Sequence, residues 1–108
     1  MKFDDYQAQA ISLAIYPQAY RITYPALGLA GETGEVCEKI KKLHRDDGSV
    51  LTEERRELLK KELGDVLWYL SALAHDLGLS LADIAQHNLD KLFSRHERGV
   101  LGGSGDTR

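Results

Sequence analysis

The stretch TEERRELLKKELGDVLWYLSALAHDL, residues 52–77, decides the fold of this 108-residue chain. Thr52 is a favourable N-cap residue, and the acidic Glu53 and Glu54 that follow it suit the positive end of a helix dipole. Gly78 comes directly after the stretch and is a usual stop signal for a helix. The sequence therefore predicts one long helix over residues 52–77.

The middle of this helix, Val66-Leu67-Trp68-Tyr69-Leu70, is apolar on every side. A helix on the outside of a small monomer keeps a polar stripe that faces water. The lack of such a stripe predicts that the segment is covered on more than one side. We therefore expect the chain to form oligomers through this helix.

Turn signals divide the rest of the chain into further helical segments. The first is expected from Asp4 or Asp5 to Ile15, because apolar residues recur there at helical spacing and Pro17 follows. Residues 16–27 hold both prolines and several tyrosines, which indicates an ordered connection. The next helix is expected from about residue 27 or 28 to about residue 44.

The last helix is expected to begin after Ser80, because Ser80-Leu-Ala-Asp83 is similar to a capping box, and to end near residue 98. Residues 99–108 contain too many glycines for regular structure, and no segment has the pattern of a strand. The fold class is therefore all-α, with one helical domain over residues 1–98 that is similar to a four-helix bundle, and a glycine-rich tail over residues 99–108.

Composition and charge limit the classes of function. The formal net charge of −3 gives no basic surface, which argues against a nucleic-acid polymer as partner. The single cysteine, Cys37, excludes an intrachain disulfide and suits a reducing compartment. The N-terminus lacks a signal pattern, and no apolar stretch is long enough to span a membrane. A cytoplasmic protein without a membrane partner is the expectation.

Two pairs of carboxylates, Glu32 with Glu35 and Glu62 with Asp65, are each spaced three residues apart. At about 100° per residue, the members of a pair lie about 60° apart on one helix face. Like charges this close repel each other, and both pairs stand beside apolar residues. Two such helices packed antiparallel would bring four oxygen ligands to a hard cation such as Mg²⁺ or Mn²⁺.

Two other interpretations of these acids follow from the residues. In one, the acids face solvent and pair with the nearby lysines Lys39, Lys42, Lys60 and Lys61. In the other, they form a di-iron site, which needs Glu-x-x-His on two helices. No glutamate here has a histidine three residues on, so iron and zinc are disfavoured.

The motif Gly31-Glu32-x-x-Glu35, followed by Glu62-Leu-Gly-Asp65-Val-Leu-Trp-Tyr, resembles the signature of the MazG-like all-α NTP pyrophosphohydrolases. That superfamily also holds the dimeric dUTPases, the dCTP pyrophosphatases and the phosphoribosyl-ATP pyrophosphohydrolases. The resemblance extends from about residue 27 to the end of the chain. It implies a MazG-type all-α fold and hydrolysis of nucleoside triphosphates.

The resemblance implies cleavage of a (deoxy)nucleoside triphosphate between its α and β phosphates, giving monophosphate and pyrophosphate, as a housekeeping activity on the nucleotide pool. It implies Mg²⁺ as cofactor, with Mn²⁺ as a substitute. Glu32, Glu35, Glu62 and Asp65 are then both the metal ligands and the catalytic residues. One of them could be the general base, and Glu35 is the first candidate for that role.

Four further residues are implied as substrate ligands. Asn88-x-x-Lys91-Leu-Phe-x-Arg95 is similar to a small single-domain branch of the family, and its three named residues share one helix face and would bind phosphate. The other interpretation of that face is a solvated basic surface. Tyr69, four residues after Asp65, resembles a position that contacts the nucleotide in dCTP pyrophosphatases, although it could also be a core or interface residue.

The expected partners are therefore a nucleoside triphosphate and further copies of the same chain, as a homodimer or homotetramer. Within the enzyme class, the alternative is a phosphoribosyl-ATP pyrophosphohydrolase that uses the same four carboxylates. Outside that class, the alternative is a non-catalytic helical interaction module in which the acidic face binds a metal ion structurally.

Overall fold

Four α-helices account for most of the chain, and the computed structural model describes all residues, 1–108. In chain order the α-helices are α1 (Phe3–Ile11), α2 (Thr23–Asp46), α3 (Glu53–Asp76) and α4 (Leu81–Glu97). A short 3₁₀ turn, η1 (Gln18–Tyr20), lies between α1 and α2. The predicted all-α class is confirmed. None of these helices combines the length and the apolar character that crossing a membrane requires.

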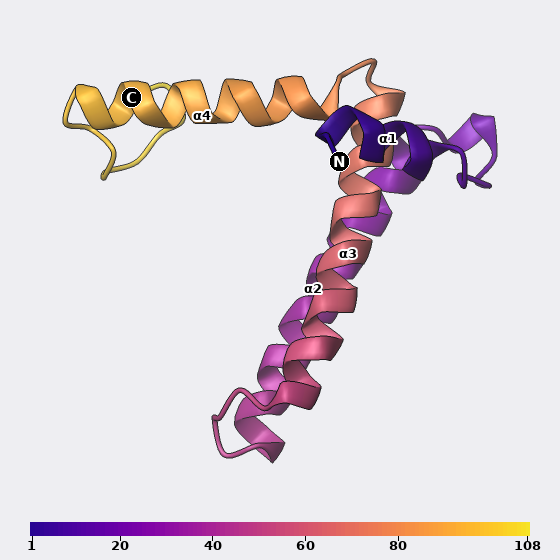
Figure 1. The fold of residues 1–108 in the computed structure, drawn as a ribbon, viewed down its shortest axis with the longest axis vertical. Coiled ribbons are helices and arrows are strands. Elements are labelled where there is room, and N and C mark those ends of the chain that lie inside the picture. The colour runs from indigo at the N-terminus through magenta and orange to yellow at the C-terminus, as the bar shows by residue number, and fades with distance from the viewer.

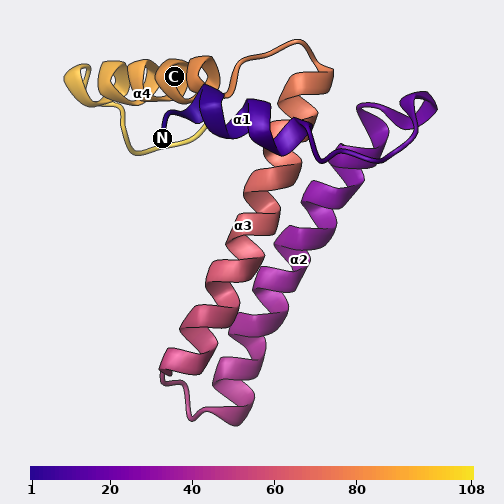
Figure 2. The same ribbon diagram turned by 45° about the vertical axis from the view of Figure 1, so that its right-hand side comes forward.

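The long helices α2 and α3 lie side by side and antiparallel, and they form the main body of the chain (Figures 1 and 2). The loop between them is fixed by Arg55, whose Nε lies 3.0 Å from the Asp47 carboxylate. Thr52 caps α3 as predicted, because its hydroxyl accepts a hydrogen bond from the Arg55 backbone N–H. The pairing of α2 with α3 puts the two predicted carboxylate pairs on neighbouring helices.

Helix α1 lies across the corner where α3 is followed by α4 (Figure 2). Its buried Gln7 donates to the carbonyl oxygens of Ser71 and Leu79 and accepts from the Leu81 N–H. Asp4 accepts hydrogen bonds from the Ser80 hydroxyl and from a backbone N–H in the first turn of α4. These bonds set the direction in which α4 leaves the body.

Helix α4 contacts α1 and α3 near its own start and then projects away from the α2–α3 pair (Figure 1). Its predicted N-cap is confirmed, because the Ser80 hydroxyl accepts from the Asp83 N–H. The four helices therefore do not all pack side by side within one chain. Only 10 of the 108 residues are buried, so the core of a single chain is small and much apolar surface stays exposed.

Two predicted helix boundaries are wrong. Helix α1 ends at Ile11 rather than Ile15, because the chain turns at Ser12, whose hydroxyl donates to a carbonyl oxygen of the preceding turn. Helix α2 begins at Thr23, so the predicted connection over residues 16–27 is partly helical. Pro25 lies in the first turn of α2, where a helix has no need of the missing N–H.

Candidate metal centre

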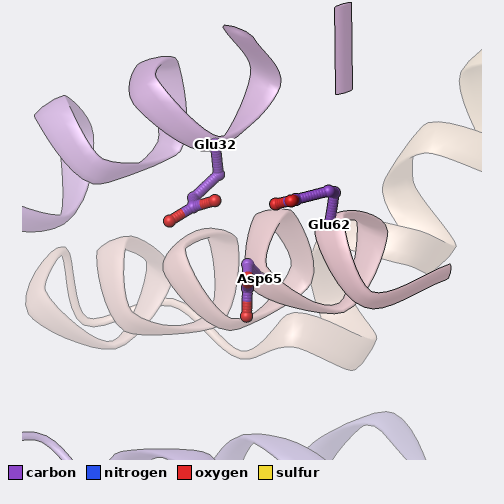
Figure 3. A group of neighbouring side chains, drawn as sticks. All are labelled: Glu32, Glu62 and Asp65. Atoms are coloured by element: carbon purple, nitrogen blue, oxygen red, sulfur yellow. The ribbon is translucent and has the colours of Figure 1, made fainter. Parts of the chain in front are cut away.

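Three of the four predicted carboxylates converge between α2 and α3. Glu32 reaches from α2 toward α3, which carries Glu62 and Asp65 (Figure 3). One oxygen from each carboxylate lies within 4.8 Å of the others. Glu32 and Glu62 are half-buried and Asp65 is exposed. We refer to these three residues as the acidic cluster.

The two helices approach closely beside the acidic cluster because α2 has a glycine there. The ring of Tyr69, one turn after Asp65 on α3, lies against the backbone at Gly28, and a Cβ at Gly28 would overlap that ring. The structure shows the close approach, by a neighbouring helix.

Burial and the neighbouring negative charges both affect the ionisation of the Glu32 carboxyl group. Burial raises the pKa of this carboxyl group, and the negative charges of Asp65, Glu62 and Glu35 raise it further. A cation bound between these groups would remove the repulsion that disfavours the ionised form. The cluster is therefore arranged in a way that favours a positive partner.

The chain supplies one positive partner itself. The Lys39 ammonium, from α2, lies 3.3 Å from a carboxylate oxygen of Glu62. Of the other lysines considered as partners, Lys42 pairs with Glu38, and neither Lys60 nor Lys61 forms an ion pair. Lys39 is therefore the one lysine of this group that pairs with a carboxylate of the acidic cluster. The interpretation of the acids as members of solvent-facing ion pairs explains Glu62 but not the other acids.

The remaining residues predicted on α2 and α3 lie close by. Glu35 is exposed and lies outside the acidic cluster, although its charge contributes to the raised pKa of Glu32. Burial raises the pKa of Tyr69, as do Tyr24 and the charges of Glu32 and Asp65, which puts the phenol near the cluster. The indole of Trp68 instead donates to the Ala10 carbonyl oxygen and ties α3 to α1.

The structure does not bring the residues predicted on α4 to the cluster within one chain. Asn88 is exposed on α4, the helix that projects away from the α2–α3 pair (Figure 1). Lys91 and Arg95 both pair with Asp106 of the tail, and Arg95 is buried. Within a single chain, the Arg95 side chain is therefore bonded to the tail and is not open to solvent.

Tyr6, on α1, is a residue that no motif of the sequence indicated. Burial raises the pKa of its phenol, and the charge of Asp65 raises it further. This electrostatic coupling gives no signal in the sequence, because α1 and α3 come together only in the fold.

The donors of the cluster suit a hard divalent cation. All of them are carboxylate oxygens, they come from two helices, and they carry more negative charge than Lys39 neutralises. Mg²⁺ and Mn²⁺ prefer such oxygen ligands, whereas zinc and iron sites usually include imidazole or thiolate. A metal in this place would be held by Glu32, Glu62 and Asp65.

Glu32→Gln is expected to stabilise the protein in the absence of divalent metal. A carboxyl group whose pKa is raised by folding costs stability while it is ionised, and the cost disappears as the pH falls through the raised pKa. The melting temperature in EDTA at neutral pH should rise by about 2–4 °C, and the gain should vanish in acid.

Glu38→Gln on the same helix is the matched control for that experiment. The Lys41 ammonium lowers the pKa of Glu38, so this carboxylate favours folding at neutral pH and its removal should not stabilise the protein. Equal melting temperatures for wild type and Glu32→Gln in EDTA would contradict the repulsion inferred at the cluster.

Two comparisons with known proteins find a match for this chain. The family model described as the MazG nucleotide pyrophosphohydrolase domain matches residues 23–100, from the first residue of α2 to just beyond α4. A protein of Mycobacterium phage L5 named Gene 37 protein is 46% identical over 114 aligned positions, which cover the whole of both chains. No solved structure matches the chain.

Proposed function

Because the chain belongs to the MazG nucleotide pyrophosphohydrolase domain family, we propose that it hydrolyses (deoxy)nucleoside triphosphates to monophosphate and pyrophosphate. The observation that carries the proposal is the acidic cluster of Glu32, Glu62 and Asp65, within the region that matches the family model. The family is one of metal-dependent nucleoside triphosphate pyrophosphohydrolases. Mg²⁺ is the proposed ion, and Mn²⁺ should substitute for it.

The proposed mechanism uses the carboxylates in two ways. Glu32, Glu62 and Asp65 would hold Mg²⁺, and the ion would supply positive charge to offset the negative charge of the triphosphate and to activate water for attack. Glu35 is the proposed general base, because it is exposed about one turn along α2 from Glu32, beside the proposed metal ligands. Tyr69 is proposed to contact the nucleoside beside the cluster.

A second copy of the chain is proposed to complete the site. Asn88 and Lys91 are the proposed phosphate ligands, but α4 projects away from the cluster of its own chain (Figure 1). The apolar residues 66–70 of α3 are only half-buried in a single chain, and Leu63 on the same helix is 56% exposed. Association through α3 would cover this surface and could bring α4 of one copy toward the carboxylates of another.

Leu63→Lys should convert the oligomer to a monomer. Burying a leucine side chain contributes about 1.5–3 kcal/mol, and an unpaired lysine in its place would cost more than that. Sedimentation equilibrium at micromolar concentration should give a dimer or tetramer for wild type. Leu13→Lys, at a leucine that is 72% exposed in the turn after α1, is the control and should leave the mass unchanged. A folded wild-type monomer would contradict the proposal.

The reaction itself is tested by chromatography of the products formed from each common NTP and dNTP. Monophosphate and pyrophosphate should form with Mg²⁺, and neither should form in EDTA. Diphosphate and phosphate would contradict cleavage between the α and β phosphates. Phosphoribosyl-ATP is included in the panel, because activity on that compound alone would identify the alternative substrate.

A metal-binding module without catalysis is the alternative outside the enzyme class. It predicts that Mg²⁺ raises the melting temperature while no nucleotide is consumed. The membership of a family of hydrolases favours the enzyme, and the same panel of nucleotides separates the two.

A further inference from the structure

The tail over residues 99–108 has a defined conformation that folds back along α4 (Figures 1 and 2). One side chain organises it. The Arg108 guanidinium donates hydrogen bonds to the carbonyl oxygens of four tail residues, namely Val100, Leu101, Gly102 and Gly105. The Arg108 main-chain oxygen in turn accepts from the side chain of Arg98, the C-cap residue of α4. The tail is therefore a closed loop attached to the helix.

This loop carries Asp106 to two basic side chains of α4. A carboxylate oxygen of Asp106 lies 2.8 Å from the Lys91 Nζ and 3.2 Å from an Arg95 Nη2. The same Arg95 nitrogen donates to the Asp106 carbonyl oxygen. Asp106 therefore bridges Lys91 and Arg95, which are one helical turn apart.

The two basic residues, Arg95 and Lys91, differ in exposure and therefore in the role that each can have. The side chain of Arg95 is only 6% exposed, so it serves as the buried anchor of the loop. The side chain of Lys91 is 35% exposed, and its ammonium donates one of its three N–H groups to Asp106. Lys91 can thus still meet an anion while Asp106 holds it.

We propose that Asp106 is a positioning residue, held by Arg95, that fixes the Lys91 ammonium for binding the phosphates of the substrate. The inference rests on the proposed function, in which Lys91 is a phosphate ligand. A free lysine side chain has many rotamers, and ordering one on binding costs about 0.5–1.5 kcal/mol. The bridge imposes that order before the substrate arrives.

Direct competition is the other role that Asp106 could have, since its carboxylate lies where a phosphate oxygen could bind. The geometry favours positioning. The loop is held to α4 by Arg95 and Arg98 and internally by Arg108, so it does not depend on Lys91 for its place. A phosphate can approach the free N–H groups of Lys91 without displacing the loop.

The test compares Asp106→Asn with Asp106→Glu, and with Thr107→Ala as control, because the Thr107 side chain is exposed and forms no hydrogen bond. Asp106→Asn should raise the KM for the nucleotide about threefold to tenfold and leave kcat within about twofold. It should weaken the binding of inorganic pyrophosphate, with Mg²⁺ present, by a similar factor. Asp106→Glu should recover most of both losses, and Thr107→Ala should match wild type.

Pyrophosphate binding separates failure of this inference from failure of the proposed function. If no nucleotide is hydrolysed but Asp106→Asn still weakens pyrophosphate binding, the proposed function is wrong and the positioning role stands. If nucleotides are hydrolysed and Asp106→Asn changes neither KM nor pyrophosphate affinity, positioning is wrong. A lower KM in Asp106→Asn would also overturn it and would show that Asp106 competes with the substrate.

Discussion

Glu62→Gln is expected to reduce turnover of nucleoside triphosphate by about 10³-fold, because it replaces an anionic ligand of the proposed metal site with a neutral amide. Glu62 is half-buried in the acidic cluster, and it also holds the Lys39 ammonium at 3.3 Å. Its replacement by glutamine therefore removes one negative charge from the acidic cluster. A glutamine has nearly the same size, so the packing of α3 should stay intact.

The stability of Glu62→Gln should change little. The loss of the ion pair with Lys39 costs some stability, because both side chains are largely buried, at 19% and 17% exposed. At the same time, the substitution relieves part of the repulsion that raises the pKa of Glu32. Circular dichroism should show unchanged helicity, and Mn²⁺ binding followed by electron paramagnetic resonance should weaken strongly.

Glu38→Gln is the matched control for this experiment. Glu38 lies on α2 outside the cluster and pairs with Lys41 and Lys42 at 2.9 and 3.7 Å. Its substitution should leave turnover within about twofold of wild type. Wild-type turnover in Glu62→Gln would contradict the assignment of the cluster as the catalytic metal site.

The second large effect is expected at Asp76, where Asp76→Ala should lower the free energy of unfolding by about 3 kcal/mol. Asp76 ends α3 and is only 8% exposed. Its carboxylate accepts hydrogen bonds from the Tyr16 hydroxyl at 2.8 Å and from the Ile22 N–H at 2.9 Å. Removal of the carboxylate leaves both donors without a partner.

The Ile22 contact matters because the backbone is strained there. Ile22 has φ 69° and ψ −60°, and the Thr23 N–H donates to the Arg21 carbonyl oxygen across it, which makes a γ-turn directly before α2. A β-branched residue in this conformation costs about 1–3 kcal/mol. The bond to Asp76 stabilises the turn, so the loss of Asp76 should loosen the start of α2.

Urea unfolding gives the free energies, and the phenol of Tyr16 gives an independent readout. Burial, the hydrogen bond to Asp76 and the charge of Asp76 together raise the pKa of Tyr16 to about 12, against a smaller lowering by Arg21. A phenol with a raised pKa contributes stability below pH 10, and this contribution is lost as the pH rises toward 12. In Asp76→Ala, ultraviolet titration should find the Tyr16 pKa closer to 10.

Asp90→Ala is the control for the Asp76 experiment. Asp90 is exposed on α4 and accepts a hydrogen bond only from Gln86, so its removal should cost less than about 0.5 kcal/mol. Equal stability of Asp76→Ala and wild type would contradict the structural role assigned to Asp76.

Local features of the fold could be predicted because their signals are local in sequence. Thr52 and Ser80 cap their helices as predicted, since an N-cap needs only a hydroxyl and a backbone N–H three residues on. The carboxylate spacing also predicted the convergence of Glu32 with Glu62 and Asp65, because residues three apart share one helix face.

Features that depend on contacts between distant segments could not be predicted. The direction of α4 depends on Gln7 and Asp4, which bond to residues more than 60 positions away. The start of α2 likewise depends on Asp76, which lies 54 positions from Ile22 in the sequence. The glycines of the tail correctly predicted irregular structure, but they gave no sign that Arg108 would close it into a loop.

The most direct test of the central claim is ³¹P NMR of one nucleoside triphosphate incubated with Mg²⁺ and either wild type or Glu62→Gln. Wild type should produce the signals of nucleoside monophosphate and pyrophosphate, and Glu62→Gln should leave the triphosphate signals unchanged over the same time. Release of orthophosphate with nucleoside diphosphate, or equal rates for the two proteins, would contradict the claim.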